Sequence, residues 1–203
     1  MTIENKPYPV TVKGDLSIPP GRWVWIFKCI LAIPHYFVLF FLSIGFAVSW
    51  IISWFSIVFT GKYPKGLFDY NVGVLRWSWR VGFYAYEALG TDKYPPFSLD
   101  PDPEYPADLS VEYPEKLSQG LVWVKWWLLA IPQWIIVGVF QGGRNWIGLA
   151  PLMSLVRGIV LLFTGKQLED LFKFTIGLDK WSYRVYGYVA LMTDQYPPFR
   201  FQD

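Results

Sequence analysis

Residues 23–59 read WVWIFKCILAIPHYFVLFFLSIGFAVSWIISWFSIVF and contain a single Lys, Lys28, and no carboxylate. A transmembrane helix needs about 20 mostly apolar residues, with about 17 as the usual lower limit. These 37 residues are therefore too many for one span and enough for two short ones. We predict a helical hairpin that turns at the weak break Ser43-Ile44-Gly45. The alternative is one span from His35 to Phe59 after a kink at Pro34.

A second apolar tract follows later in the chain. Leu121 to Phe140 is apolar, Gln141 to Asn145 interrupts the tract, and Trp146 to Phe163 resumes it. Two spans joined by a Gly-Gly turn fit this pattern. The composition also favours a membrane protein, because only 17% of the residues are charged, against about a quarter in a typical soluble domain.

The chain also repeats itself. Four motifs occur twice in the same order: Lys28 with Ala32-Ile33-Pro34 and Lys125 with Ala130-Ile131-Pro132; Phe59 to Lys62 and Phe163 to Lys166; Trp77-Ser-x-Arg80 and Trp181-Ser-x-Arg184; Thr91 to Phe97 and Thr193 to Phe199. Such ordered matches predict two copies of one unit, residues 1–99 and 107–203, joined by an acidic, Pro-rich linker at residues 100–106.

These motifs resemble those of a bacterial membrane-protein family known only as a domain of unknown function and often found in tandem. The resemblance rests on Ile-Pro-His at 33–35, Phe-Thr-Gly-Lys-Tyr-Pro at 59–64, Gly-Val-Leu-Arg-Trp at 73–77 and Thr-Asp-Lys-Tyr-Pro-Pro-Phe at 91–97. It covers nearly the whole chain and is looser in the second copy, where Gln133 replaces His35. It implies a bacterial membrane location and supplies no activity.

The predicted fold is an all-α membrane protein. Each copy has a transmembrane hairpin, at about 23–59 and about 121–163, and then an interfacial amphipathic helix, at about 67–89 and about 171–192. Two spans per copy keep the matched basic flanks on one side, with Arg144 alone at a hairpin tip. The positive-inside rule then places both termini in the cytoplasm, in a multi-pass protein of the bacterial inner membrane.

Short cytoplasmic strands are expected outside the membrane. Tyr8 to Val12 alternates apolar and polar residues, and Asp108 to Val111 does so weakly. The Tyr-Pro-Pro-Phe tails, which close each copy, could pair with these strands in a small sheet.

The sequence predicts no enzyme, no cofactor and no metal site. The apolar tracts contain no carboxylate, and the chain has one His and one Cys. Phe-Thr-Gly-Lys lacks the upstream glycines of a phosphate loop and is instead expected to end a helix with a left-handed Gly cap. His35 could ligate a cofactor, but Gln133 at the equivalent position favours a structural hydrogen bond.

Seven residues are candidates for contacts with lipids or partner proteins: Lys28, Lys125, Trp77, Arg80, Trp181, Arg184 and Arg157. The basic-aromatic pairs could clamp an anionic lipid, and the alternative is a plain aromatic belt. For the two lysines the alternative is snorkelling towards the headgroups. An intramembrane Arg suggests a functional site, and for Arg157 snorkelling or a subunit contact is the alternative.

The absence of a polar pathway and the aromatic-rich surface favour a non-catalytic scaffold or accessory subunit of a larger membrane complex. A lipid-binding or lipid-organising module is the alternative, and a small transporter or channel is the second alternative. The expected partners are membrane lipids and other membrane protein subunits. Nucleic acid is not expected, because the net charge is only +2 and the basic residues flank apolar tracts.

Overall fold

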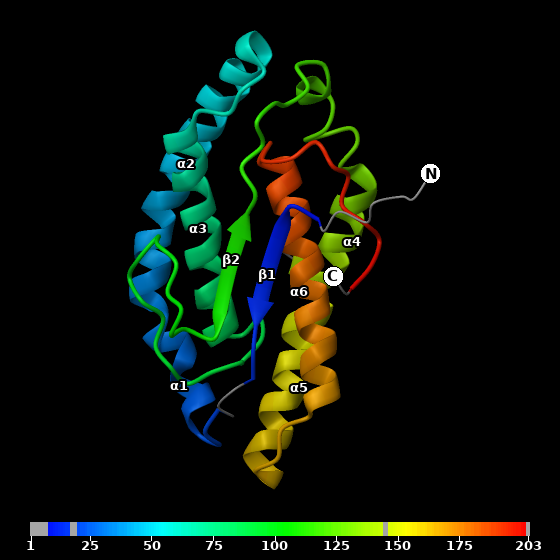
Figure 1. The fold of residues 1–203 in the computed structure, drawn as a ribbon. Helices are drawn as coiled ribbons and strands as arrows, with labels where there is room; N and C mark the ends of the chain where they lie inside the picture. The colour runs from blue at the N-terminus through cyan, green and yellow to red at the C-terminus, as the bar shows by residue number, and fades with distance from the viewer. Residues whose placement is uncertain (1–7, 17–19, 144–145, 202–203) are drawn as a thin grey trace.

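The computed structural model describes residues 8–16, 20–143 and 146–201. The chain forms three layers, with a two-stranded ribbon on one side, two helices in the middle and the remaining helices outside them (Figure 1). The two copies contribute equivalent elements to every layer.

The ribbon consists of β1 (Val10–Gly14) and β2 (Ala107–Val111), which pair antiparallel with Val10 opposite Val111. Both strands bury their first and third residues, because alternate side chains of a strand point to the same face. Both expected strands therefore form, and they pair with each other instead of with the Tyr-Pro-Pro-Phe tails.

The middle layer consists of α3 (Lys65–Tyr84) and α6 (Glu169–Val189). These helices were predicted as interfacial helices with a basic face at the headgroups, and that position is wrong. α3 packs between β2 and α2, and α6 packs between β1 and the outer helices of the second copy. Arg80 and Arg184 are consequently buried, where carbonyls and a carboxylate of the chain contact their guanidinium groups and Arg80 Nε has no hydrogen-bond partner among the described residues.

The outer layer of the first copy is one long helical segment. α1 (Val24–Leu31) and α2 (Ile33–Thr60) are separated only by Ala32, and Gly61 ends α2 in the left-handed conformation with φ 69°. The predicted hairpin turn at Ser43 to Gly45 is wrong, because these residues lie within α2. The expected Gly cap is confirmed here and at Gly165, where φ is 70°.

The outer layer of the second copy follows the same course with an interruption. It contains η1 (Leu121–Trp123), α4 (Ile131–Gln141), a minimal hairpin of β3 (Gly142–Gly143) and β4 (Trp146–Ile147), and α5 (Leu149–Thr164). Instead of folding back as the predicted hairpin, α4 and α5 follow one another along α6 (Figure 1).

The interruption is an insertion in a continuous helical course. Twenty-five positions separate Pro34 from Phe59, whereas thirty-one separate Pro132 from Phe163, and the difference of six equals the length of the segment Gly142–Ile147. A Cβ atom on Gly148 would lie 2.2 Å from the carbonyl carbon of Gln141. The backbone before the insertion and the backbone after it are thus in direct contact. Gly is needed at position 148 because a Cβ atom there would overlap the backbone of Gln141.

The two copies run in opposite directions. Trp25 of α1 packs on Gly158 of α5, and Arg22 donates to the Phe163 carbonyl at 3.1 Å. At the other end, the ring of Trp123 lies 4.6 Å from that of Trp54, centroid to centroid. The outer helices α1–α2 and α4–α5 are therefore antiparallel neighbours, as the antiparallel ribbon requires.

Within the described residues, one helical segment is long and apolar enough to cross a membrane, Val24–Thr60. α4 and α5 are shorter apolar helices. A multi-pass arrangement with two spans per copy is therefore not supported. Arg144, the expected basic residue at a hairpin tip, lies outside the described residues.

Deletion of residues 142–147 tests this arrangement. We expect the shortened chain to fold, with helical circular dichroism and a thermal midpoint in detergent within a few degrees of the parent, because Gln141 and Gly148 already touch. If α4 and α5 instead formed a tight helical hairpin, removing its turn would prevent folding, and loss of the helical signal would contradict the structure.

Candidate functional site

The repeated lysines, Lys28 and Lys125, each make buried contacts with a Thr-Asp pair of the same copy, and we call each set of contacts a Lys latch. Lys28 Nζ lies 2.8 Å from Asp92 Oδ1 and donates to the Thr91 carbonyl at 2.7 Å. Lys125 Nζ lies 2.7 Å from Asp194 Oδ1 and donates to the Thr193 carbonyl, and both lysines are fully buried. Removing the carboxylate of either pair leaves a fully buried ammonium without its counter-ion, which costs about 3–5 kcal/mol. The repeated Lys and Thr-Asp motifs therefore tie the start of each outer helix to the end of the same copy.

The repeated tryptophans are also internal. Trp77 Nε1 donates to His35 Nδ1 at 3.0 Å, and Trp181 Nε1 donates to Gln133 Oε1 at 2.7 Å. Both indole rings are buried. His35 thus makes the structural hydrogen bond that Gln133 makes in the second copy.

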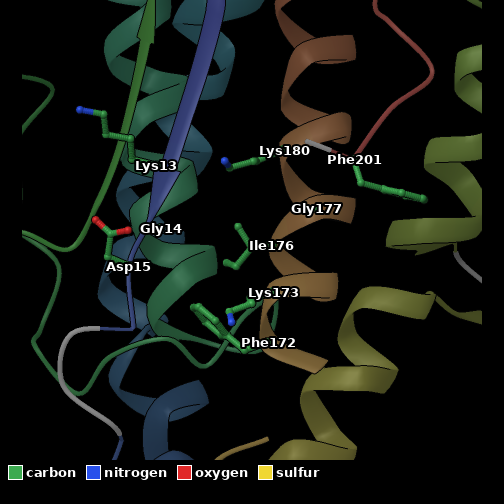
Figure 2. A pocket seen from close by; sticks show the side chains of 9 residues that line it. All are labelled: Lys13, Gly14, Asp15, Phe172, Lys173, Ile176, Gly177, Lys180 and Phe201. Atoms are coloured by element: carbon green, nitrogen blue, oxygen red, sulfur yellow. The ribbon is translucent and has the colours of Figure 1, made fainter. Parts of the chain in front are cut away.

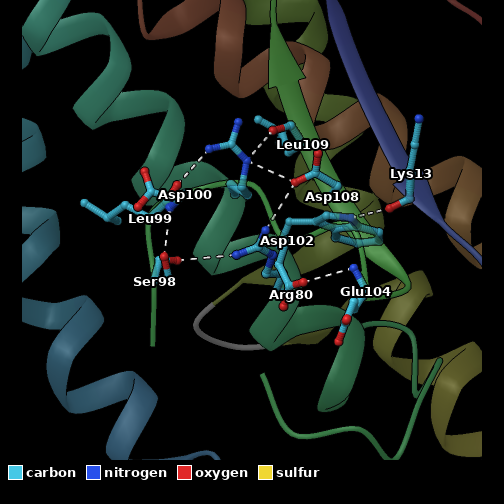
Figure 3. Close-up of polar contacts among 11 residues, drawn as sticks. Lys13, Arg80, Ser98, Leu99, Asp100, Asp102, Glu104, Asp108 and Leu109 are labelled. Atoms are coloured by element: carbon cyan, nitrogen blue, oxygen red, sulfur yellow. Dashed lines mark hydrogen bonds and ion pairs between the residues drawn. The ribbon is translucent and has the colours of Figure 1, made fainter. Parts of the chain in front are cut away.

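The arginines of α3 form a network with the ribbon and the tail (Figure 3). Asp108 Oδ1 lies 3.0 Å from Arg76 Nε and 3.4 Å from Arg80 Nη2. Arg76 also donates to the carbonyls of Leu99 and Leu109. In the second copy, Arg184 Nη1 donates to the Arg200 carbonyl at 2.9 Å.

Arg157 joins the two copies. It is 1% exposed, and its Nη1 donates to the Ala88 carbonyl at 2.5 Å while its guanidinium lies 4.6 Å from the centre of the Phe172 ring. All seven sequence candidates are thus buried and make contacts within the chain, so we do not place them in a surface site.

Two buried carboxyls near Arg157 were missed in the sequence. Gln141 Nε2 donates to Asp179 Oδ1 at 2.9 Å, and Ser154 Oγ donates to the Glu87 backbone carbonyl at 2.5 Å. Burial raises the pKa of Glu87 to about 7, and burial, together with the nearby Glu87 charge, raises the pKa of Asp179 well above its ordinary value.

This buried cluster could have been predicted from positions at which one copy has a charged residue and the other does not. Asp179 stands where the first copy has Leu75, and Arg157 stands where it has Ser53. The charges that break the repeat converge on one buried place between the copies, where Asp179 and Arg157 attract each other.

A groove with several charged residues lies between β1 and α6, and we call it the second-copy groove (Figure 2). Its volume is about 550 Å³. It is lined by Lys13, Gly14, Asp15, Phe172, Lys173, Ile176, Gly177, Lys180 and Phe201. Three cations and one carboxylate in a groove with aromatic walls can bind an anionic group. No cluster of three or more His, Cys, Asp or Glu side chains that could hold a metal occurs in the part of the chain that the structure describes.

Comparison with protein families accounts for both copies. A family model described as a domain of unknown function, DUF4389, matches residues 22–98 and again residues 121–200. The chain belongs to the DUF4389 family. The two matches agree with the repeat in the sequence, and each contains one Lys latch and one buried Trp pair. Comparison with curated proteins gave no match, and comparison with solved structures gave none either.

The raised pKa of Glu87 predicts a pH-dependent stability. The folded state holds the Glu87 proton up to about pH 7, whereas the unfolded state releases it near its ordinary pKa of 4.5. This contribution to the free energy of unfolding is therefore complete below about pH 4.5 and is lost as the pH rises to about 7. We expect Glu87→Gln to raise the thermal midpoint by a few degrees at about pH 8 relative to its effect at about pH 5.

The control is Glu115→Gln, which neutralises an exposed carboxyl and should leave the pH dependence of the parent unchanged. Parallel pH profiles for the parent and the Glu87→Gln variant would show that Glu87 does not titrate in this range.

Proposed function

We propose that this chain is a non-catalytic scaffold that lies in the plane of one membrane leaflet and presents its ribbon to other membrane subunits. The supporting observation is that the exposed apolar residues belong mostly to the outer helices, whereas the ribbon lies on the other side of α3 and α6. The proposal keeps the accessory-subunit role and the bacterial inner-membrane location that the sequence favours.

The apolar surface belongs to the outer helices. Phe27, Phe41 and Phe55 are 57%, 56% and 51% exposed, although they are spread over most of the α1–α2 segment. The second copy exposes Trp134, Ile135 and other apolar residues of α4 and α5 in the same layer. Only 11% of the most apolar stretch of α1–α2 is buried, so this segment is not the core helix of a soluble protein.

Tryptophans gather where the two outer helices meet. Trp123 and Trp127 are 55% and 48% exposed, and the ring of Trp123 lies 4.6 Å from that of Trp54 in α2, centroid to centroid. Indole rings favour the boundary between headgroups and acyl chains, because they are apolar with one N–H donor. This placement supports a lipid leaflet as the occupant of the apolar surface.

A spanning orientation meets a physical obstacle. The α1–α2 segment of 37 residues is about 55 Å long at 1.5 Å per residue, well beyond the hydrocarbon thickness of about 30 Å. The ribbon runs beside this segment, so spanning would place its outer backbone edges in hydrocarbon, where unsatisfied N–H and C=O groups are costly (Figure 1). A helix that lies along the leaflet keeps the ribbon in water.

Exposed ion pairs lie near both ends of α2. Lys65 and Asp69 form an exposed ion pair near the end of α2, since α3 starts there. Lys93 and Glu104 are exposed near the start of α2, where Tyr94 donates to the Leu31 carbonyl. Charged residues at both ends of α2 fit a spanning helix as well, so the in-plane orientation rests on the ribbon that runs beside the segment (Figure 1).

The orientation can be measured by the depth of labels in brominated phosphatidylcholine vesicles. In a Cys29→Ser background, single cysteines at Phe27, Phe41 and Phe55 would carry a fluorophore, with Ser110→Cys on the exposed side of β2 as the control. We expect similar quenching at all three helix positions and none at Ser110. Deep quenching at Phe41 and Ser110 together, with shallow ends, would show a spanning helix instead.

The scaffold role predicts partners. Native mass spectrometry after gentle extraction from the source membranes should show the chain bound to other membrane subunits in a fixed ratio. Extraction at high salt serves as the comparison, because contacts through a charged ribbon side weaken when charges are screened. A lone chain under both conditions would contradict the scaffold role without affecting the orientation in the leaflet.

A further inference from the structure

The second-copy groove has a counterpart in the first copy, which we call the first-copy groove. It also has a volume of about 550 Å³ and lies between β2 and α3. Its walls include Phe68, Val72 and Leu99, at the positions of Phe172, Ile176 and Phe201. Gly73 packs on Leu99 as Gly177 packs on Phe201, which confirms that the two grooves are equivalent.

The charges of the two grooves differ. The first-copy groove is lined by Lys65 and Arg76 together with Asp69 and Asp100. Lys65 pairs with Asp69, and Arg76 pairs with Asp108 at 3.0 Å. The cations of the first-copy groove are therefore balanced by carboxylates of the chain itself.

In the second copy the balancing carboxylates are replaced. Lys173 stands at the position of Asp69, Thr11 at that of Asp108, and Lys13 at that of Ser110. Lys180 keeps the cation of Arg76. Glu169 takes the place of Lys65 but does not line the groove, so three lysines and the carboxylate of Asp15 are the charged residues in its lining.

We infer that the second-copy groove binds a phosphate-bearing anion of small-molecule size. Lysine ammonium groups bind phosphate as compact positive charges, and several in one concave site raise the local concentration of an anion. In Figure 2 Lys173 and Lys180 lie on the side of α6 that faces β1, whereas the Lys13 side chain leaves β1 on the side away from α6, so an anion in the groove meets positive charge mainly from α6. Lys13 and Lys173 are also exposed and thus accessible to a ligand.

The groove has room for more than the phosphate. Its volume of about 550 Å³ lies within the range of about 300–1,000 Å³ typical of small-molecule sites. Phe172 and Ile176 form an apolar wall, and Phe201 is 41% exposed beside them. These side chains fit an organic portion attached to the phosphate.

The position of the groove indicates a soluble ligand. Its lining comes from β1, the residue after it, α6 and the tail, and includes no residue of α1, α2, α4 or α5. The groove therefore opens away from the exposed apolar helices. Lysines bind the phosphate of a lipid headgroup and that of a soluble molecule in the same way, so the test distinguishes these two sources of the phosphate.

The test is calorimetric titration of the full chain in detergent with inorganic pyrophosphate. Lys173→Asp restores the carboxylate of the first copy and should weaken binding at least about tenfold, since it exchanges an attraction for a repulsion. The matched control, Lys62→Asp, makes the same charge change at an exposed lysine outside the groove and should change the affinity less than about twofold. Both affinities are compared at one low salt concentration.

A second measurement does not depend on a variant. Pyrophosphate should protect Lys173 from acylation, read by mass spectrometry, while Lys62 continues to react. Competition by phosphatidylcholine vesicles that contain phosphatidic acid would identify a lipid headgroup as the source of the phosphate, and its absence would identify a soluble one. If pyrophosphate gives neither heat nor protection, or if Lys173→Asp binds like the parent, the inference is overturned. Neither result depends on how the chain lies in a membrane.

Discussion

The antiparallel pairing of β1 with β2 is the constraint on which the rest of this structure depends. Each strand precedes one copy of the repeat, so pairing them antiparallel makes the two copies run in opposite directions. α3 and α6 then cover one face of the ribbon, and the outer helices cover α3 and α6. Most exposed apolar residues of both copies consequently belong to the outer helices. These helices and the ribbon lie on opposite sides of α3 and α6 (Figure 1).

Local features were predictable from the sequence, and the direction of the long helices was not. The repeat, both strands, the Gly61 and Gly165 caps and the structural role of His35 follow from motifs whose physical cause is local. The predicted hairpins failed because hydropathy reports only that a tract avoids water. The length of residues 23–59 was therefore divided into two spans, although the weak break at Ser43 to Gly45 does not interrupt α2.

The roles of the charged residues were hidden for a different reason. Lys28, Arg80 and Arg184 find their partners in the tails and the ribbon, between 16 and 64 positions away, and no periodicity in the sequence reports such contacts. Matches between the copies identified the parts that hold each copy together. The differences between the copies, such as Lys173 for Asp69 and Asp179 for Leu75, identify the groove and the buried carboxyls.

The shared ribbon has a consequence for the origin of the chain. A polypeptide with one copy would have a strand without a neighbour, and the closed arrangement for it is a homodimer whose two-fold axis passes through the ribbon. Fusion of two copies replaces association between molecules with an intramolecular contact at a high effective concentration. It also removes the requirement that a change in one half appear in the other, and one groove could then become basic while its twin kept its carboxylates.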